Sequence, residues 1–137
     1  MIIIIFQILS LIGFLISLYF TLVYRNQLAS NTPWIPKMCR MEAGDCDQII
    51  RTPDAHLFGI PNFYLGIVLY AVCIVSPFIF KPFTGVADIF MIVLGVVVGT
   101  SLYLSYSLLR VLKKRCVLCF TTHIINLGLF LLLVYYQ

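Results

Sequence analysis

Apolar residues fill four long stretches of the chain, and shorter polar segments separate them. The stretches cover residues 2–24, 57–80, 84–109 and 116–136. Each is long enough to cross the hydrocarbon core of a bilayer, which takes about 20 residues of helix. Lipid cannot hydrogen-bond bare backbone groups, so such spans fold as helices. The pattern predicts an all-α integral membrane protein, a bundle of four transmembrane helices.

The first apolar stretch has to be distinguished from a secretory signal peptide. No basic segment precedes it, and its apolar run is longer than the about 7–15 residues usual for such a peptide. We therefore expect a permanent membrane helix. Lys81-Pro82 predicts a tight turn between the second and third stretches, so consecutive helices should run antiparallel. The chain, residues 1–137, is then a single membrane domain.

Composition agrees with this pattern and excludes a soluble domain. Hydrophobic residues make up 62% of the chain and charged residues only 10%, which leaves too little polar surface for a water-soluble fold of this length. The one sizeable polar connection, residues 25–56, should form a folded cap between the first two helices. Gly95 and Gly99 in the third stretch have the spacing that lets two helices approach closely.

Four of the five cysteines form two pairs. Cys39 and Cys46 lie in the cap, and Cys116 and Cys119 open the last apolar stretch. The two connections that hold the pairs are separated by two membrane crossings, so both pairs should lie on one face of the membrane. A pair spaced like Cys116 and Cys119 at the start of a helix favours reactive thiolates. Cys73, alone in the second stretch, is expected to be a buried, inert residue.

Three kinds of chemistry fit the paired cysteines. They can exchange a disulfide with one another, they can bind zinc as four thiolates, or they can form fixed structural disulfides. The last two would make the protein a non-enzymatic membrane module that binds a partner. Against zinc, six residues separate Cys39 from Cys46, and no acid or histidine there completes a metal-binding pattern. Redox exchange is favoured, and a membrane bundle suggests a lipid-soluble quinone as the electron acceptor.

At this point the residues match a known family in order along the chain. The sequence resembles the vitamin K epoxide reductase family, in its prokaryotic type. The resemblance rests on Cys39 and Cys46 with six residues between them, Thr52, Phe58-Gly59-Ile60-Pro61-Asn62, Gly66, and Cys116-Val117-Leu118-Cys119 followed by Thr121-Thr122. A related class of four-helix thiol oxidases carries its close cysteine pair in the first loop, which is the reverse of the order here.

The resemblance implies a specific activity, a quinone-dependent thiol oxidoreductase that generates disulfides. It implies that Cys39 and Cys46 exchange with a thioredoxin-like partner, and that Cys46 passes electrons to Cys116. Cys119 would then face a bound quinone of the menaquinone, ubiquinone or vitamin K type. The other expected partners are the membrane and the quinone itself, and no nucleic acid is expected.

The resemblance also implies the residues that bind the quinone. Asn62 matches an asparagine that hydrogen-bonds a quinone oxygen, and Phe58 opens the same matched segment. His123 stands where vertebrate members have a tyrosine. It can donate to the other quinone oxygen, supply a proton, or pack as a polar residue against a neighbouring helix. This departure favours a quinone over vitamin K epoxide as the substrate.

Two rules predict opposite orientations of the protein in the cell membrane. Basic residues gather on the cysteine face, which by the positive-inside rule should be cytoplasmic. Most relatives work on the exterior face, where disulfides persist. The basic residues of the cysteine face are Arg25, Lys37, Arg40, Arg51, Arg110, Lys113, Lys114 and Arg115, against Lys81 on the other.

Overall fold

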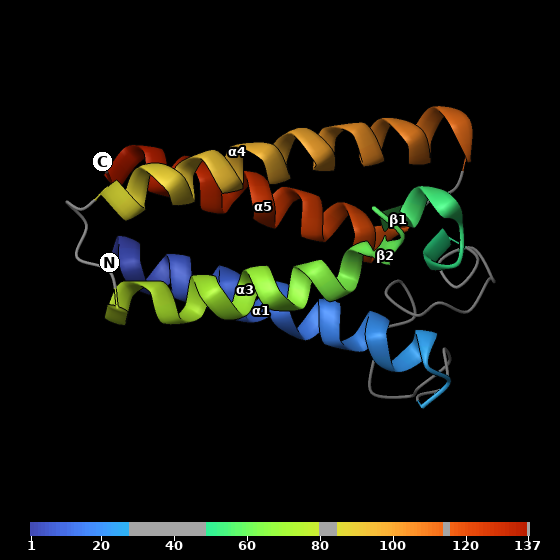
Figure 1. Ribbon diagram of the computed structural model, residues 1–137, viewed down its shortest axis with the longest axis horizontal. Coiled ribbons are helices and arrows are strands. Elements are labelled where there is room, and N and C mark those ends of the chain that lie inside the picture. The colour runs from blue at the N-terminus through green and yellow to red at the C-terminus, as the bar shows by residue number, and fades with distance from the viewer. Residues whose placement is uncertain (28–48, 80–84, 114–115, 137) are drawn as a thin grey trace.

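Four long helices build the protein, as the sequence predicted. The computed structural model describes residues 1–27, 49–79, 85–113 and 116–136. Figure 1 shows the helices lying along the long axis, with both termini at one end. The all-α membrane bundle is thus confirmed, with three helices long and apolar enough to span a membrane among the described residues and α3 shorter. The helices are α1 (Ile2–Tyr24), α3 (Asn62–Ile79), α4 (Gly85–Tyr106) and α5 (Val117–Tyr136).

The second membrane helix begins later than its apolar run suggested. We expected it to start at residue 57, but α3 starts at Asn62. The preceding residues form a small hairpin instead, in which β1 (His56–Leu57) pairs antiparallel with β2 (Ile60–Pro61). Phe58 and Gly59 turn the chain with φ angles of 53° and 78°. A short 3₁₀ helix, η2 (Pro53–Ala55), leads into this hairpin.

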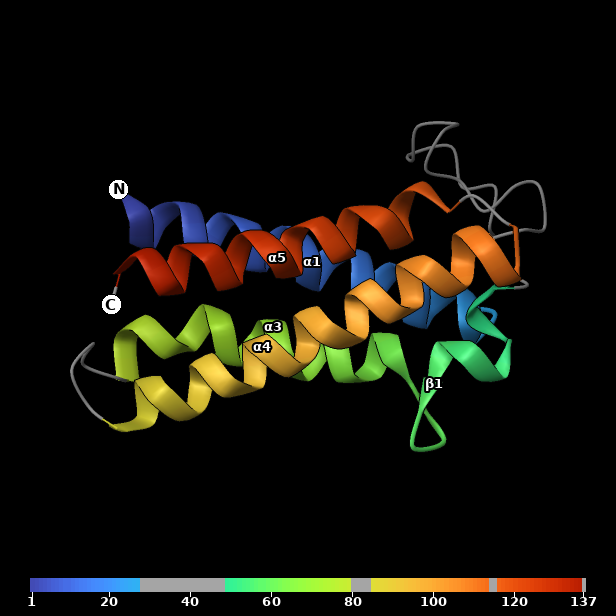
Figure 2. The same cartoon turned by 90° about the horizontal axis from the view of Figure 1, so that it is seen from above.

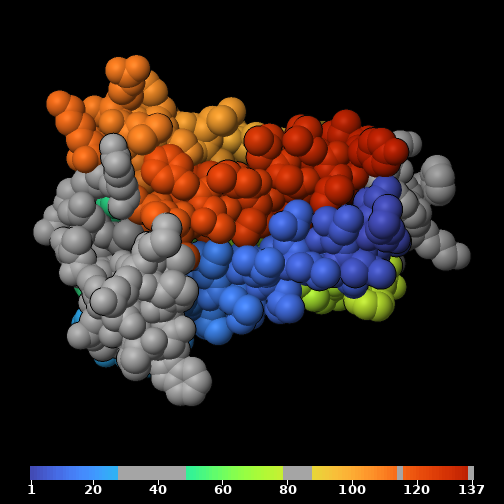
Figure 3. Space-filling model, turned by 180° about the vertical axis from the view of Figure 1, so that it is seen from behind, coloured from blue at the N-terminus to red at the C-terminus, as the bar shows by residue number. Residues whose placement is uncertain are grey.

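The four helices form a square bundle. In Figures 1 and 2 the neighbours are α1 with α3, α3 with α4, α4 with α5, and α5 with α1. Figure 3 shows α1 and α5 covering one face together. The α1–α3, α4–α5 and α1–α5 pairs make the main helix contacts, while α3 and α4 meet much less closely.

Glycines allow the closest helix approach between α1 and α3. A Cβ atom on Gly13 would clash with the Tyr70 ring, and one on Gly66 would meet the Ser17 hydroxyl at 2.7 Å. The glycines that the sequence suggested for this role do not perform it. A Cβ on Gly95 would have only ordinary contact with Phe130, and one on Gly99 would meet nothing within 4 Å.

The interior divides into two clusters of buried side chains. The first lies at the cysteine end of the bundle and contains Phe20, Val23, Ile49, Ile50, Phe63, Leu108 and Cys116. The second lies deeper and contains Phe6, Tyr70, Cys73, Leu94, Ile125 and Leu129. Many apolar residues on the outer helix faces are exposed, as expected of helices surrounded by lipid. Cys73 is fully buried.

The cysteine end of α4 changes its winding. The helix continues beyond Tyr106 as a π-helical turn, η3 (Ser107–Val111), a form found frequently at functional sites. Ser107 and Leu108 are buried there, and the Ser107 hydroxyl lies 3.4 Å from Asp54 Oδ2. This contact ties η2 to the end of α4. Lys113, with a φ of 51°, then takes the chain out of the helical path.

Candidate active site: a pocket ending at Cys119

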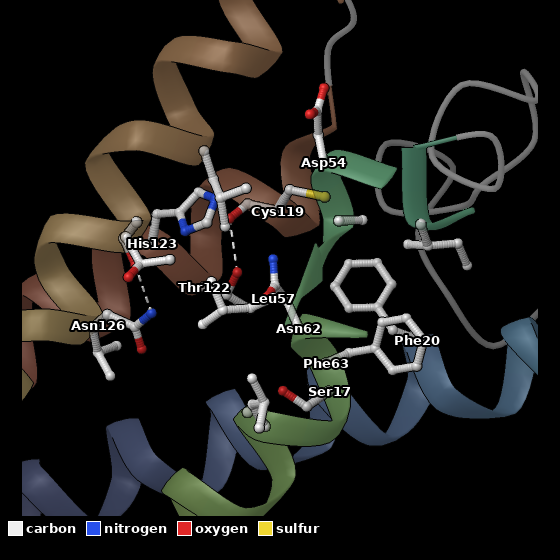
Figure 4. A pocket seen from close by; sticks show the side chains of 18 of the residues that line it. Ser17, Phe20, Asp54, Leu57, Asn62, Phe63, Cys119, Thr122, His123 and Asn126 are labelled. Carbon is white, nitrogen blue, oxygen red and sulfur yellow. Dashed lines mark hydrogen bonds between the residues drawn. The ribbon is translucent and has the colours of Figure 1, made fainter. Parts of the chain in front are cut away.

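A cavity of about 220 Å³ lies inside the bundle at its cysteine end. All four long helices contribute to its wall, together with the segment that precedes α3 (Figure 4). Most of its lining is apolar, including Phe20, Leu57, Phe63, Leu69, Val97, Leu104 and Leu108. The wall also contains residues with polar side chains: Ser17, Thr52, Asp54, Asn62, Tyr70, Thr100, Ser101, Cys119, Thr122, His123 and Asn126.

One face of α5 supplies four polar groups of this wall. They are Cys119 and the residues three, four and seven positions after it, Thr122, His123 and Asn126. In a helix this spacing places side chains above one another on one face. The Thr122 hydroxyl donates to the Cys119 carbonyl at 2.7 Å, so it is turned back on its own helix.

The two cysteines at the start of α5 have different surroundings. Cys116 is fully buried within the cluster at the cysteine end of the bundle. Its sulfur accepts a hydrogen bond from the backbone N–H of Cys119 at 3.4 Å, one of the amide groups that the first turn of a helix leaves without a helical partner. Cys119 is half-buried and lines the cavity. One sulfur is thus packed beside the cap segment, and the other borders the pocket.

Asn62 reaches the pocket because the hairpin ends at Pro61 and α3 begins at the next residue. It is the first residue of α3, and its side chain projects from the start of that helix towards the α5 side of the cavity (Figure 4). An amide at this position offers two N–H donors and an acceptor. The structure therefore brings Asn62 and Cys119 to the same pocket, although they are 57 positions apart in the sequence.

His123 carries a buried polar atom that the protein does not satisfy. Its Nδ1 atom is shielded from solvent and has no hydrogen-bond partner within the described part of the chain. Buried polar groups are nearly always hydrogen-bonded. An imidazole in this state, in the wall of a pocket, is suited to bind a polar group of a ligand.

One expected site residue lies away from the pocket, and the structure does not describe two others. Phe58 is at the tip of the hairpin, 94% exposed, and does not line the cavity. Figure 2 shows this hairpin projecting sideways from the bundle. Cys39 and Cys46 lie outside the described residues.

The structure adds residues that the sequence did not single out. Asp54, Tyr70 and Asn126 all line the pocket. The helical spacing from Cys119 was a signal for Asn126, because it is two turns further along α5 on the same face. Thr52, part of the matched pattern, also lines the pocket, and its hydroxyl donates to the Ile49 carbonyl at 2.7 Å. It thereby holds the chain as it leaves the cap.

Comparison with known proteins identifies the family of the chain. No curated protein matches the sequence. The family model described as "Vitamin K epoxide reductase family" matches residues 4–134, nearly the whole chain. The chain therefore belongs to the vitamin K epoxide reductase family, whose members are quinone-linked membrane oxidoreductases.

Proposed function

We propose that this protein is a membrane thiol oxidase that makes disulfides and reduces a quinone. Electrons would leave the thiols of a thioredoxin-like partner, cross Cys39 and Cys46, then Cys116 and Cys119, and reach the quinone. The observation that carries the proposal is the position of Cys119, which borders an apolar cavity inside a membrane bundle.

The cavity suits the ring of a lipid-soluble quinone. Pockets for drug-sized ligands measure about 300–1,000 Å³, so a cavity of about 220 Å³ matches a ring headgroup and not a long tail. Leu65 and Val96 belong to the cavity wall and are 37% and 64% exposed. They lie on α3 and α4, the neighbours that meet least closely. A tail can therefore leave sideways into lipid while the ring stays inside.

The reaction balances without an outside oxidant other than the quinone. A thiolate of the protein attacks one sulfur of a neighbouring disulfide, and the bond moves by exchange. Oxidation of the Cys116 and Cys119 thiols to a disulfide releases two electrons and two protons. The quinone takes up both and becomes the hydroquinone.

Chain connectivity supports exchange between the two pairs. Ile49 packs in the same cluster as Cys116, and it follows Cys46 by three residues in the sequence. Three residues of chain span at most about 11 Å. The covalent tether thus keeps Cys46 within about 11 Å of Ile49, which belongs to the cluster that contains the buried Cys116.

Asn62 and His123 would bind the ring in this scheme. The Asn62 amide can donate to a quinone oxygen, and negative charge builds on that oxygen during reduction, so the bond strengthens in the transition state. His123 can contact the ring with the buried nitrogen that the protein leaves without a partner. It would serve either as a second donor or as a source of the proton.

The test separates the two cysteine pairs. Cys39→Ala should block electron transfer from a thioredoxin-like protein, and should leave quinone reduction by a small dithiol largely intact. Cys119→Ala should abolish both activities, because no sulfur then faces the ring. Quinone reduction is followed by absorbance in detergent or nanodiscs. Equal loss of dithiol-driven activity in the two variants would contradict the proposed order of transfer.

A further inference from the structure

A buried polar network joins three helices at the inner part of the pocket. The Tyr70 hydroxyl donates to Asn126 Oδ1 at 2.7 Å, and the Asn126 amide nitrogen donates to Ser101 Oγ at 2.9 Å. Tyr70, Asn126 and Ser101 are 2%, 9% and 6% exposed and belong to α3, α5 and α4. Polar groups buried this deeply are costly unless they are hydrogen-bonded, so the network stabilises one arrangement of the three helices there.

The network leaves one donor of Asn126 available. A side-chain amide carries two N–H donors. In the part of the chain that the structure describes, the Asn126 nitrogen makes one hydrogen bond, to Ser101. The two bonds at Tyr70 and Ser101 hold the plane of the amide, so the second N–H has a fixed direction.

The position of Asn126 relates this donor to the reactive sulfur. Asn126 lines the cavity, as do Tyr70 and Ser101, and it follows Cys119 by seven residues on α5. Seven residues of helix rise about 10 Å and return to nearly the same face. Figure 4 shows Cys119, His123 and Asn126 succeeding one another along this wall. The pocket thus has a sulfur near one end and a fixed amide near the other.

We propose that Asn126 is a quinone-binding residue that donates a hydrogen bond to the ring oxygen farther from Cys119. Tyr70 and Ser101 are positioning residues that hold its amide. This inference rests on the proposed quinone reduction. As the cysteine pair becomes a disulfide and the quinone accepts two electrons, charge builds on both ring oxygens. A donor whose orientation is set in advance stabilises that charge without rearrangement.

The test measures the hydrogen bonding of each ring oxygen separately. Menadione, a naphthoquinone without a lipid tail, is labelled isotopically at one carbonyl at a time and bound to the protein in nanodiscs. The infrared stretching frequency of each carbonyl then reports its own hydrogen bond. The double variant Tyr70→Phe/Asn126→Leu removes the amide together with the hydroxyl that it accepts from. Replacing both partners of a buried hydrogen bond by apolar groups can be nearly neutral for stability.

The expected result is specific to one oxygen. In the double variant the carbonyl farther from Cys119 should shift to higher frequency, and the other should stay unchanged. The kcat/KM for menadione should fall about three- to tenfold, the effect of one hydrogen bond, with the KM for the dithiol unchanged. Tyr70→Phe alone keeps the amide and should cause a smaller shift. Thr121→Val is the matched control, because that hydroxyl donates to the Val117 carbonyl on its own helix and does not line the cavity.

Two outcomes would overturn the inference, and they can be told apart. If the unmodified protein binds menadione and neither carbonyl shifts in the double variant, Asn126 does not contact the ring, and the proposed function still stands. If the unmodified protein neither binds nor reduces menadione or any tailed quinone, both proposals fail together.

Discussion

The side chains around Cys119 divide into those that are satisfied within the protein and those that are not. Thr122 and Thr121 donate to carbonyls of α5, so they have no hydrogen to offer a ligand. His123 has a buried nitrogen without a partner in the described structure, and Asn62 projects into the pocket. Ligand chemistry is therefore expected at the second pair of residues and not at the threonines.

Asn62→Ala tests whether the Asn62 amide binds the quinone ring. The variant should raise the quinone KM or lower kcat/KM by about three- to tenfold, because one hydrogen bond to the ring is lost. The thermal unfolding midpoint should change little, since the side chain lies in a cavity wall at the start of a helix. Steady-state kinetics at varied quinone concentration measure the effect. Unchanged kinetics would remove Asn62 from the site.

His123→Tyr separates the two roles of the imidazole by pH. If His123 supplies a proton, the rate should fall with rising pH as the histidine loses its proton, and the tyrosine variant should lack that fall. If His123 only donates a hydrogen bond, the variant should keep both activity and pH profile. The measurement is kcat against pH with a small dithiol as reductant. An active His123→Tyr protein with an unchanged pH profile would contradict the proton role, and loss of all activity in a folded variant would contradict the role of a simple hydrogen-bond donor.

At the scale of elements, the hairpin before α3 places Asn62 and isolates Phe58. Its two-residue turn needs left-handed backbone at Phe58, a conformation that costs roughly 1–2 kcal/mol for a residue with a side chain and that asparagine tolerates better. Phe58→Asn should therefore keep or slightly raise the thermal unfolding midpoint. It should leave the quinone KM unchanged, because Phe58 does not line the cavity.

Leu57→Ala is the matched control for the hairpin. Leu57 precedes Phe58 and lines the cavity, so this variant should raise the quinone KM. If Phe58→Asn weakened quinone binding as much as Leu57→Ala does, Phe58 would return to the binding site that the sequence suggested for it.

The sequence predicted the four long helices. It did not predict the hairpin before α3 or the π-helical turn after α4. Long, mostly apolar runs predict α1 and α5, because lipid leaves the backbone no alternative to a helix. Leu57, Phe58 and Ile60 of the hairpin are apolar, so hydropathy merged the hairpin with the helix that follows it. The local signs of a break were Gly59, which tolerates left-handed backbone, and Pro61, which disfavours helix at the residue before it. The π-helical turn at Ser107 has no signature in composition.

The sequence predicted those residues of the candidate site that belong to the matched family pattern. Cys116, Cys119, Asn62 and His123 came from the pattern, and the structure brings Cys119, Asn62 and His123 to one pocket. The pairing of Tyr70 with Asn126 was not readable, because it depends on how α3 is rotated about its axis. That rotation is set by packing such as the Tyr70 ring against Gly13, which no local pattern reveals.

At the scale of the whole molecule, the charge distribution predicts the orientation. The two connections at the cysteine end carry basic residues, and those that the structure describes are Arg25, Arg51, Arg110 and Lys113. Basic residues in short connections favour the cytoplasmic side. A membrane-impermeant thiol reagent should therefore fail to label reduced Cys39 in intact cells and should label it in inverted vesicles.

A charge reversal provides the control for orientation. Neutral residues at Lys113, Lys114 and Arg115, with basic residues added beside Lys81, should turn the active face outward and make Cys39 accessible in intact cells. Efficient labelling of the unmodified protein in intact cells would contradict the charge rule here. It would place the cysteine face on the exterior side, the alternative that the resemblance suggested.

The late start of α3 also has a mechanical consequence for the bilayer. Its 18 residues span about 27 Å, whereas the 23 residues of α1 span about 34 Å. A hydrocarbon core of about 30 Å is a few ångströms shorter than α1 and a few longer than the described part of α3, so a tilt of α1 and a locally thinner bilayer beside α3 would both reduce the hydrophobic mismatch. Local thinning there brings headgroups closer to the pocket wall on α3. Bilayer thickness thereby becomes a variable that adjusts how a lipid-borne substrate approaches the sulfur of Cys119.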